Sequence, residues 1–272
     1  MFLDWFRKTP GHGTNDAVNR GLDSIASGMP ILAGLSVPDR GTLVALAGWL
    51  IRNKAFVTAD GTTLDDEAVA VLALQLALPA LHLGEAAFAG WEEVIVYPDA
   101  FRVRDVWLDD DGLMHEADRW LVGEARHDGP LILSLPDVLD SPRLDGWNVA
   151  IHELAHKLDQ LDGEANGYPP LHRGMDRAAW HAAWSDAYEG FGRALERGEE
   201  GWLDPYAGEH PAEFFAVLSE YFFEAPHWVR DDYPTLYQQL AQFYRQDPAG
   251  RLARLPLEGL LPPPEAGSTA HD

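Results

Sequence analysis

The sequence predicts an α+β fold that is mostly helical, with a small sheet in the middle of the chain. Apolar residues recur at helical spacing before about residue 84 and again after residue 145. Between these regions lie short runs that are rich in β-branched residues and bounded by turn residues. Helices and strands that are segregated along the chain, rather than alternating, are typical of α+β proteins.

Two helices are predicted before the strands. Over residues 38–52, leucine and alanine recur at helical spacing. Residues 65–83 are apolar on most sides, so we expect a buried helix that ends or kinks near Pro79. The first 28 residues show no sustained period and are rich in Gly, Asn and Asp, so they are expected to form a loosely ordered arm.

The remaining elements are predicted from the spacing of apolar residues, which changes from helical to strand-like after about residue 84 and becomes helical again after residue 145. Three short strands are predicted at residues 93–97, 120–125 and 130–135. Four further helices are predicted at residues 146–161, 176–197, 211–224 and 233–246. We therefore expect a single domain over residues 29–256, followed by a proline-rich tail over residues 257–272 that cannot pack and is disordered.

Composition excludes several classes of protein. The 272 residues carry 20 basic and 44 acidic side chains, a net charge of −24, whereas a nucleic-acid partner requires clustered Lys and Arg. The absence of cysteine excludes a disulfide framework, a thiolate metal site and a cysteine nucleophile. No stretch has the length and apolarity of a membrane span, and the N-terminus lacks the features of a signal peptide. We expect a cytoplasmic protein with no membrane partner.

One segment carries the pattern of a metal site. His152 and His156 belong to an H-E-x-x-H motif on a predicted amphipathic helix, where they lie one turn apart and project to the same side. Two such imidazoles match two corners of a tetrahedral Zn²⁺ site. Glu153 lies further round the helix and is placed to act as general base on an attacking water. We therefore predict one zinc ion per chain.

The third protein ligand is less certain from spacing alone. Asp162 occupies the ligand position of the longer metzincin pattern, but Asp159 replaces the glycine that this pattern needs, so the helix would carry Asp162 past the metal. Glu213 and Glu220 are seven residues apart on one face of a later helix, and either could reach the metal. A glutamate from a downstream helix would make the site a gluzincin, and periodicity leaves both candidates open.

The motifs together resemble the Mlc titration factor A family of bacterial zinc metallopeptidases. The segments that carry the resemblance are residues 151–159, 204–207 and 211–223, with further matches at 94–98 and 242–248. The resemblance extends from about residue 30 to residue 254. It implies a fold similar to the metallopeptidase domain of anthrax lethal factor.

The resemblance also implies residue roles. It implies that His152, His156 and Glu213 hold the zinc, and so it chooses Glu213 over Glu220. It marks Tyr206, seven residues before Glu213, whose phenol is suited to donate a hydrogen bond to the oxyanion formed during peptide hydrolysis. The tyrosine lies in a predicted loop, which favours exposure over core packing.

The expected function is that of a zinc-dependent peptidase acting on peptides or proteins, with Glu153 as the catalytic carboxylate. The family name implies a second role, binding an Mlc-type transcriptional repressor and so modulating sugar phosphotransferase gene expression. The alternative is a non-catalytic zinc-binding protein that acts only by sequestering a regulator, although the presence of Glu153 favours the enzyme. Asp159 is a candidate to accept the spare imidazole N–H of a zinc ligand, with helix capping as the competing role. An edge strand at 120–125 or 130–135 would bind an extended peptide.

Overall fold

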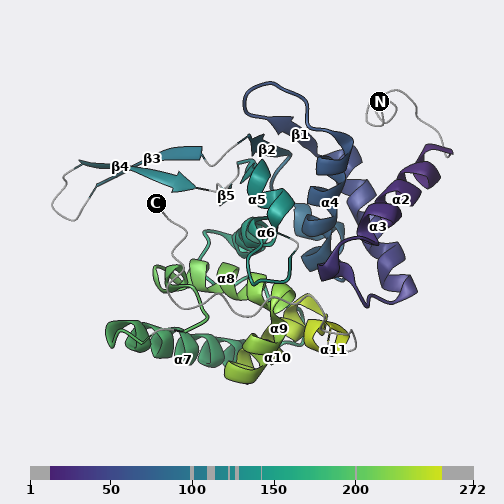
Figure 1. The fold of residues 1–272 in the computed structure, drawn as a ribbon. Helices are drawn as coiled ribbons and strands as arrows, with labels where there is room; N and C mark the ends of the chain where they lie inside the picture. Colours follow the sequence, from purple (N-terminus) through teal and green to yellow (C-terminus); the bar gives the residue numbers. More distant parts are fainter. Residues whose placement is uncertain are drawn as a thin grey trace.

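The computed structural model describes residues 13–98, 101–108, 114–121, 123–125, 129–141, 143–199 and 201–252. Figure 1 shows a mostly helical chain with a small sheet, in agreement with the α+β prediction. The proline-rich tail expected over residues 257–272 lies outside the described residues, as do the first 12 residues of the expected arm.

Three helices form the N-terminal part of the fold. They are α2 (Gly13–Ala26), α3 (Val37–Asn53) and α4 (Asp66–Ala80). Helix α3 begins after Ser36, whose Oγ accepts a hydrogen bond from the Asp39 backbone N–H at 3.2 Å. Helix α4 is buried on nearly all sides, as its apolar sequence predicts, and it ends one residue after Pro79.

The expectation of a loosely ordered arm over residues 1–28 is wrong for residues 13–26, which form α2. Val18, Leu22 and Ala26 are buried and lie four residues apart, so they form a stripe along one side of the helix. This stripe packs in the core that includes α3 and α4. The polar residues between these positions hide the helical period in the sequence.

A four-stranded sheet follows in the order β1-β2-β6-β5. Its strands are β1 (Ala55–Thr58), β2 (Glu93–Tyr97), β5 (Gly123–Ala125) and β6 (Leu131–Ser134). Strands β1, β2 and β6 run parallel to one another, and β5 pairs antiparallel to β6 at one edge of the sheet. The predicted strand at 130–135 is therefore interior, and the edge strand comes from the end of the segment predicted at 120–125.

A separate hairpin precedes β5. Strands β3 (Phe101–Leu108) and β4 (Met114–Leu121) pair antiparallel along their whole length. In Figure 1 this hairpin extends away from the helices. The sequence analysis predicted neither β1 nor β3, and it joined β4 and β5 into one strand.

The rest of the described chain consists of helices and the loops that join them. Its helices are α5 (Leu135–Asp140), α6 (Val149–Asp159), α7 (Arg177–Glu196), α8 (Pro211–Glu224), α9 (Pro226–Asp232), α10 (Pro234–Tyr244) and α11 (Pro248–Leu252). Short 3₁₀ turns lie at Pro30–Leu32 (η1), Glu85–Phe88 (η2), Gln160–Asp162 (η3) and Pro205–Gly208 (η4). The bounds of α8 confirm the predicted helix at 211–224, and α6, α7 and α10 lie within the helices predicted around them.

Helix α6 occupies the centre of the molecule. It contacts the sheet through β5 and β6, the N-terminal helices through α4, and the C-terminal helices through α8 (Figure 1). Beyond α8, aromatic rings from α7, α8 and α10 pack against one another, with Trp180 and Phe215 fully buried among them. Among the described residues, no helix combines the length and the apolarity that crossing a membrane requires.

Candidate metal centre

Helix α6 carries the two histidines of the H-E-x-x-H motif. Asn148 caps its N-terminus, since the Oδ1 atom accepts a hydrogen bond from the Ile151 backbone N–H at 3.1 Å. Ile151, Leu154 and Leu158 are buried in the core and fix the rotation of the helix. That rotation turns the two imidazoles away from the core and toward α8.

Three ligand atoms from α6 and α8 converge on one point. The Nε2 atoms of His152 and His156 are 3.1 Å apart, and each lies 3.2 Å from Oε2 of Glu213. Among the described residues, these three form the one group of histidine and acidic side chains close enough to hold a metal ion, with ligand atoms within 4.8 Å of one another. The fold thus brings Glu213 to the two histidines from 57 residues beyond His156 in the chain, and the three residues predicted from the sequence lie together.

The spacing of these atoms fits a zinc ion. Ligands about 2.0–2.1 Å from a tetrahedral zinc lie about 3.3 Å from one another, close to the three distances observed. The side chains of His152 and His156 are each 12% exposed and that of Glu213 is 20% exposed, so these side chains are partly accessible to solvent. A set of three protein ligands is typical of a catalytic zinc site, whereas a structural zinc site has four.

The charges around this triangle favour a cation. Burial disfavours ionisation of Glu213, but hydrogen bonds from the two imidazoles outweigh it and hold the pKa of Glu213 well below its ordinary value. Burial lowers the pKa of His152, but the charge of Glu220 and hydrogen bonds to Glu213 and Glu220 raise it well above its ordinary value. Both shifts mean that positive charge is stabilised between these side chains.

Glu220 lies on the other side of His152 from the triangle. Its Oε1 is 2.7 Å from His152 Nδ1, so Nδ1 donates its proton to Glu220, and Nε2 is left as the nitrogen that could ligate a metal. A carboxylate that binds the second nitrogen of a ligating histidine fixes both its tautomer and the orientation of its ring. Glu220 therefore supports the centre from outside it.

Glu153 and Tyr206 lie beside the ligands. Glu153 is buried on α6 with 3% exposure, and its negative charge contributes to the raised pKa of His152. Tyr206 belongs to η4, and its ring centroid lies 6.3 Å from that of His152. The ring is only partly buried, as the loop signal in the sequence predicts.

Asp159 has a different role from the one considered for it. Its Oδ2 accepts a hydrogen bond from the Gly167 backbone N–H at 2.6 Å, so Asp159 holds the loop after α6. The carboxylate that binds the imidazole of His152 is that of Glu220. Asp162 is exposed at the end of η3, outside the metal group. The α-helix ends at Asp159 rather than at Leu161, and the 3₁₀ turn that follows directs Asp162 to solvent.

Comparison with protein families decides the class. A family model described as glucose-regulated metallo-peptidase M90 matches residues 4–245. The chain belongs to the M90 metallo-peptidase family. Relatives named Mlc titration factor A, from Yersinia pestis (strain Pestoides F) and Yersinia pseudotuberculosis serotype O:1b, are 41% identical over 246 residues. These matches cover 88% of this chain and 90% of each relative.

The sequence analysis of this M90 chain missed two residues near the centre, Asn148 and Glu224. Asn148 directly precedes the apolar stripe of α6, which is the signal of an N-cap. Glu224 lies one turn after Glu220 in a helix of largely apolar residues, and two carboxylates on such a helix indicate buried partners. Both signals were available, but neither identifies the partner.

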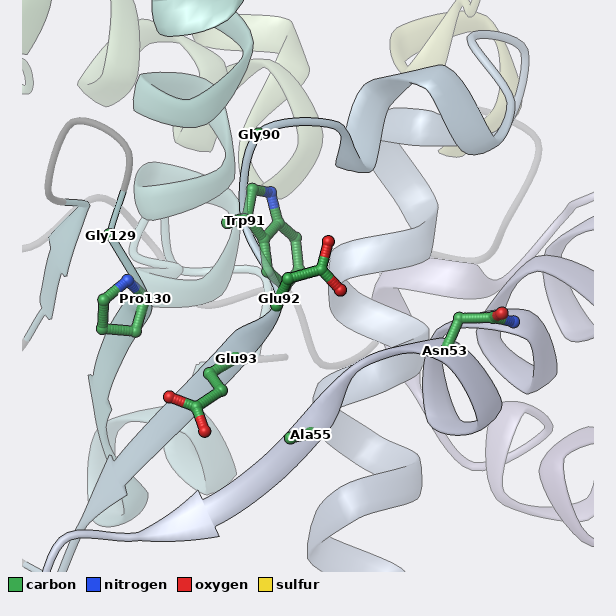
Figure 2. A pocket seen from close by; sticks show the side chains of 8 residues that line it. All are labelled: Asn53, Ala55, Gly90, Trp91, Glu92, Glu93, Gly129 and Pro130. Carbon is green, nitrogen blue, oxygen red and sulfur yellow. The ribbon is translucent and has the colours of Figure 1, made fainter.

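A hollow of about 490 Å³ lies away from the metal centre, at the start of β1, β2 and β6. It is lined by Asn53, Ala55, Gly90, Trp91, Glu92, Glu93, Gly129 and Pro130. Figure 2 shows the carboxylates of Glu92 and Glu93 pointing in different directions, so they do not converge on a common point. The metal centre, rather than this hollow, carries the chemistry expected of an M90 metallo-peptidase.

The loop held by Asp159 touches the helix that carries Glu213. Gly167 has φ +78°, and a Cβ there would lie 2.4 Å from the Pro211 carbonyl oxygen at the start of α8. We expect Gly167→Ala to displace this turn, lower the free energy of unfolding by more than about 2 kcal/mol and weaken zinc binding. Thermal unfolding and chelator competition measure the two effects.

Gly61→Ala is the matched control for this substitution. Gly61 has φ +77°, and a Cβ there would meet nothing within 4 Å. Gly61→Ala should lower the free energy of unfolding by only about 1–2 kcal/mol, the cost of placing a non-glycine residue in the left-handed region. It should leave zinc affinity unchanged. Equal effects of the two substitutions on zinc affinity would show that the contact with Pro211 does not position Glu213.

Proposed function

We propose that this protein is a zinc-dependent peptidase of the gluzincin type. The observation that carries the proposal is the convergence of His152, His156 and Glu213 in a member of a metallo-peptidase family. Two imidazoles, one carboxylate and an open fourth position form the ligand set of gluzincins such as thermolysin. The interatomic distances of 3.1–3.2 Å support zinc over larger ions with oxygen-rich shells.

The side chains of the centre supply the steps of peptide hydrolysis. A bound zinc would polarise the scissile carbonyl and acidify a water molecule. Glu153 accepts the proton of the attacking water and delivers it to the leaving amine. Tyr206 donates its phenolic O–H to the oxyanion that develops as the water adds. As ligands of a bound zinc, His152 and His156 would present their Nε2 lone pairs to the ion.

The substrate is proposed to be an extended peptide bound along β5. Among the described residues this strand is the last of the four-stranded sheet, and it contacts α6, the helix that carries His152 and His156. Backbone pairing of this kind recognises chain direction more than side chains. It is compatible with both aminopeptidase and endopeptidase activity.

Purified protein is expected to contain about one zinc per chain, and His152→Ala or His156→Ala is expected to remove it. Each imidazole supplies one of only three protein ligands, and two ligands hold zinc too weakly to survive purification. Elemental analysis of the purified variants and cleavage of a mixed peptide library test the site and the activity together. Stoichiometric zinc in both alanine variants would refute the site.

A second role is suggested by the name of the relatives, Mlc titration factor A. We propose that the chain also binds a transcriptional repressor of the Mlc type in the cytoplasm, and so modulates sugar phosphotransferase gene expression. The rival is a zinc-binding protein that acts only by such sequestration. Repressor binding by a wild-type protein that cleaves no peptide in the library would favour the rival, whereas library cleavage that requires Glu153 favours the enzyme.

A further inference from the structure

Two carboxylates on α8 fasten the beginning of α6. Glu220 and Glu224 are one turn apart and each is 1% exposed. Glu220 binds His152 Nδ1 through Oε1 at 2.7 Å and accepts the Asn148 backbone N–H through Oε2 at 2.7 Å. One carboxylate thus holds both the metal-facing ring and the residue that caps its helix.

Glu224 completes the connection through the side chain of Asn148. Its Oε1 accepts from Asn148 Nδ2 at 2.8 Å, and its Oε2 accepts from the Leu144 backbone N–H at 2.6 Å. Asn148 is fully buried, and its Oδ1 caps α6. Every oxygen of the two carboxylates and both polar atoms of the Asn148 side chain are therefore engaged.

The segment held in this way has an uncommon backbone. Leu144 has φ +63°, a conformation that residues with a Cβ seldom adopt. Gly146 has φ +101°, and a Cβ there would lie 2.4 Å from the ring of Tyr221. Such a backbone persists only where its surroundings determine it, and here the determining contacts come from α8.

Burying the carboxylates of Glu220 and Glu224 costs free energy of folding. This cost argues that their hydrogen bonds to the start of α6 have a role other than stability. Neither Glu220 nor Glu224 forms an ion pair with a Lys or Arg of the described residues, although both are buried. Burial raises the pKa of Glu224 well above its ordinary value. Apolar residues of similar size often stabilise a protein more than buried charged groups do.

We propose that Asn148 and Glu224 are positioning residues for the metal centre. Glu224 orients the Asn148 side chain, and Asn148 fixes both the start of α6 and the carboxylate of Glu220. Glu220 in turn sets the ring and the tautomer of His152. This inference rests on the proposed metal site, but it concerns two residues that lie outside the ligand set.

Exchanging the hydrogen-bond donor and acceptor between Asn148 and Glu224 tests whether their hydrogen bond positions the metal centre. In Asn148→Asp, an oxygen would face Glu224 Oε1, and in Glu224→Gln, the amide nitrogen would face either Asn148 Nδ2 or the Leu144 N–H. Each single variant therefore loses one hydrogen bond. In the double variant Asn148→Asp/Glu224→Gln, the glutamine donates to the aspartate and accepts from Leu144, so the pattern is restored with unchanged net charge.

We expect each single variant to bind zinc about 10- to 100-fold more weakly and the double variant to recover most of that loss. Zinc affinity is measured by chelator competition on the full chain, and the His152 Nδ1–H resonance by NMR should shift in the single variants and return in the double variant. Unchanged zinc affinity in both single variants, or a double variant no better than the weaker single variant, would overturn the proposal.

Ser219→Ala separates positioning from general stability. Ser219 is buried on α8 beside Glu220, but its Oγ bonds the Phe215 carbonyl and Tyr244 rather than α6. It should lower thermal stability and leave zinc affinity unchanged. Zinc affinity and the NMR signal do not depend on hydrolysis, so a wild-type protein that binds zinc but cleaves no peptide would refute the peptidase and leave this test intact.

Discussion

Glu153→Gln is expected to keep its zinc and to lower the rate of peptide hydrolysis by about 100-fold or more, the scale of a lost general base. Glutamine has nearly the shape of glutamate and fits the buried position, but its amide cannot accept a proton from water. Glu153 is not in the ligand group, so metal content should not change. The measurement is kcat on a peptide substrate, with zinc content determined on the same sample.

Glu189→Gln provides the control for a neutralised carboxylate. Glu189 lies on α7 with its side chain 67% exposed, where loss of its charge affects neither the metal centre nor the core. Both zinc content and kcat should match the wild-type protein. If Glu153→Gln also retained a wild-type rate, another base would be at work and the proposed mechanism would fail.

Glu213→Gln should weaken zinc binding more than Glu220→Gln does. Glu220→Gln alters a residue that binds a ligand rather than the metal, so we expect it to weaken zinc binding by about 10- to 100-fold. A neutral amide is a much poorer zinc ligand than a carboxylate, and Glu213 Oε2 lies 3.2 Å from both Nε2 atoms. In Glu220→Gln, the amide nitrogen would face one of two N–H donors, so one hydrogen bond is lost. Chelator competition on both variants compares the two losses.

Asp162→Asn serves as the control for this pair. Asp162 is exposed and lies outside the metal group, so its zinc affinity should equal that of the wild-type protein. A larger loss in Glu220→Gln or Asp162→Asn than in Glu213→Gln would exclude Glu213 as the third ligand. Such a result would also refute the ligand assignment carried over from the family.

The local patterns of the sequence predicted much of this molecule. Helical spacing located α3, α4, α6, α7, α8 and α10, and the H-E-x-x-H motif placed two imidazoles on one side of α6. These predictions succeed because neighbours on one helix are fixed by a period of about 3.6 residues. Helix α2 was not predicted, because its polar residues obscure a narrow buried stripe.

Strand order could not be predicted in the same way. Pairing joins residues that are distant in the chain, such as Val94 with Leu131, and neither segment contains a mark of its partner. The sequence analysis therefore left the edge strand open between 120–125 and 130–135. The tertiary structure placed β6 inside the sheet and β5 at its edge, next to α6.

The sequence by itself determined that His152 and His156 share one side of a helix and that Glu213 and Glu220 share one face of another. Helical spacing left open which glutamate meets both imidazoles; the family resemblance implied Glu213, and only the tertiary structure gives the physical reason. Seven residues separate the two carboxylates by about 10.5 Å along α8, so they reach different sides of the His152 ring. Glu213 lies at the Nε2 side with His156, and Glu220 lies at Nδ1. Helical periodicity specifies a face, whereas the contact between two helices specifies which turn of that face meets its partner.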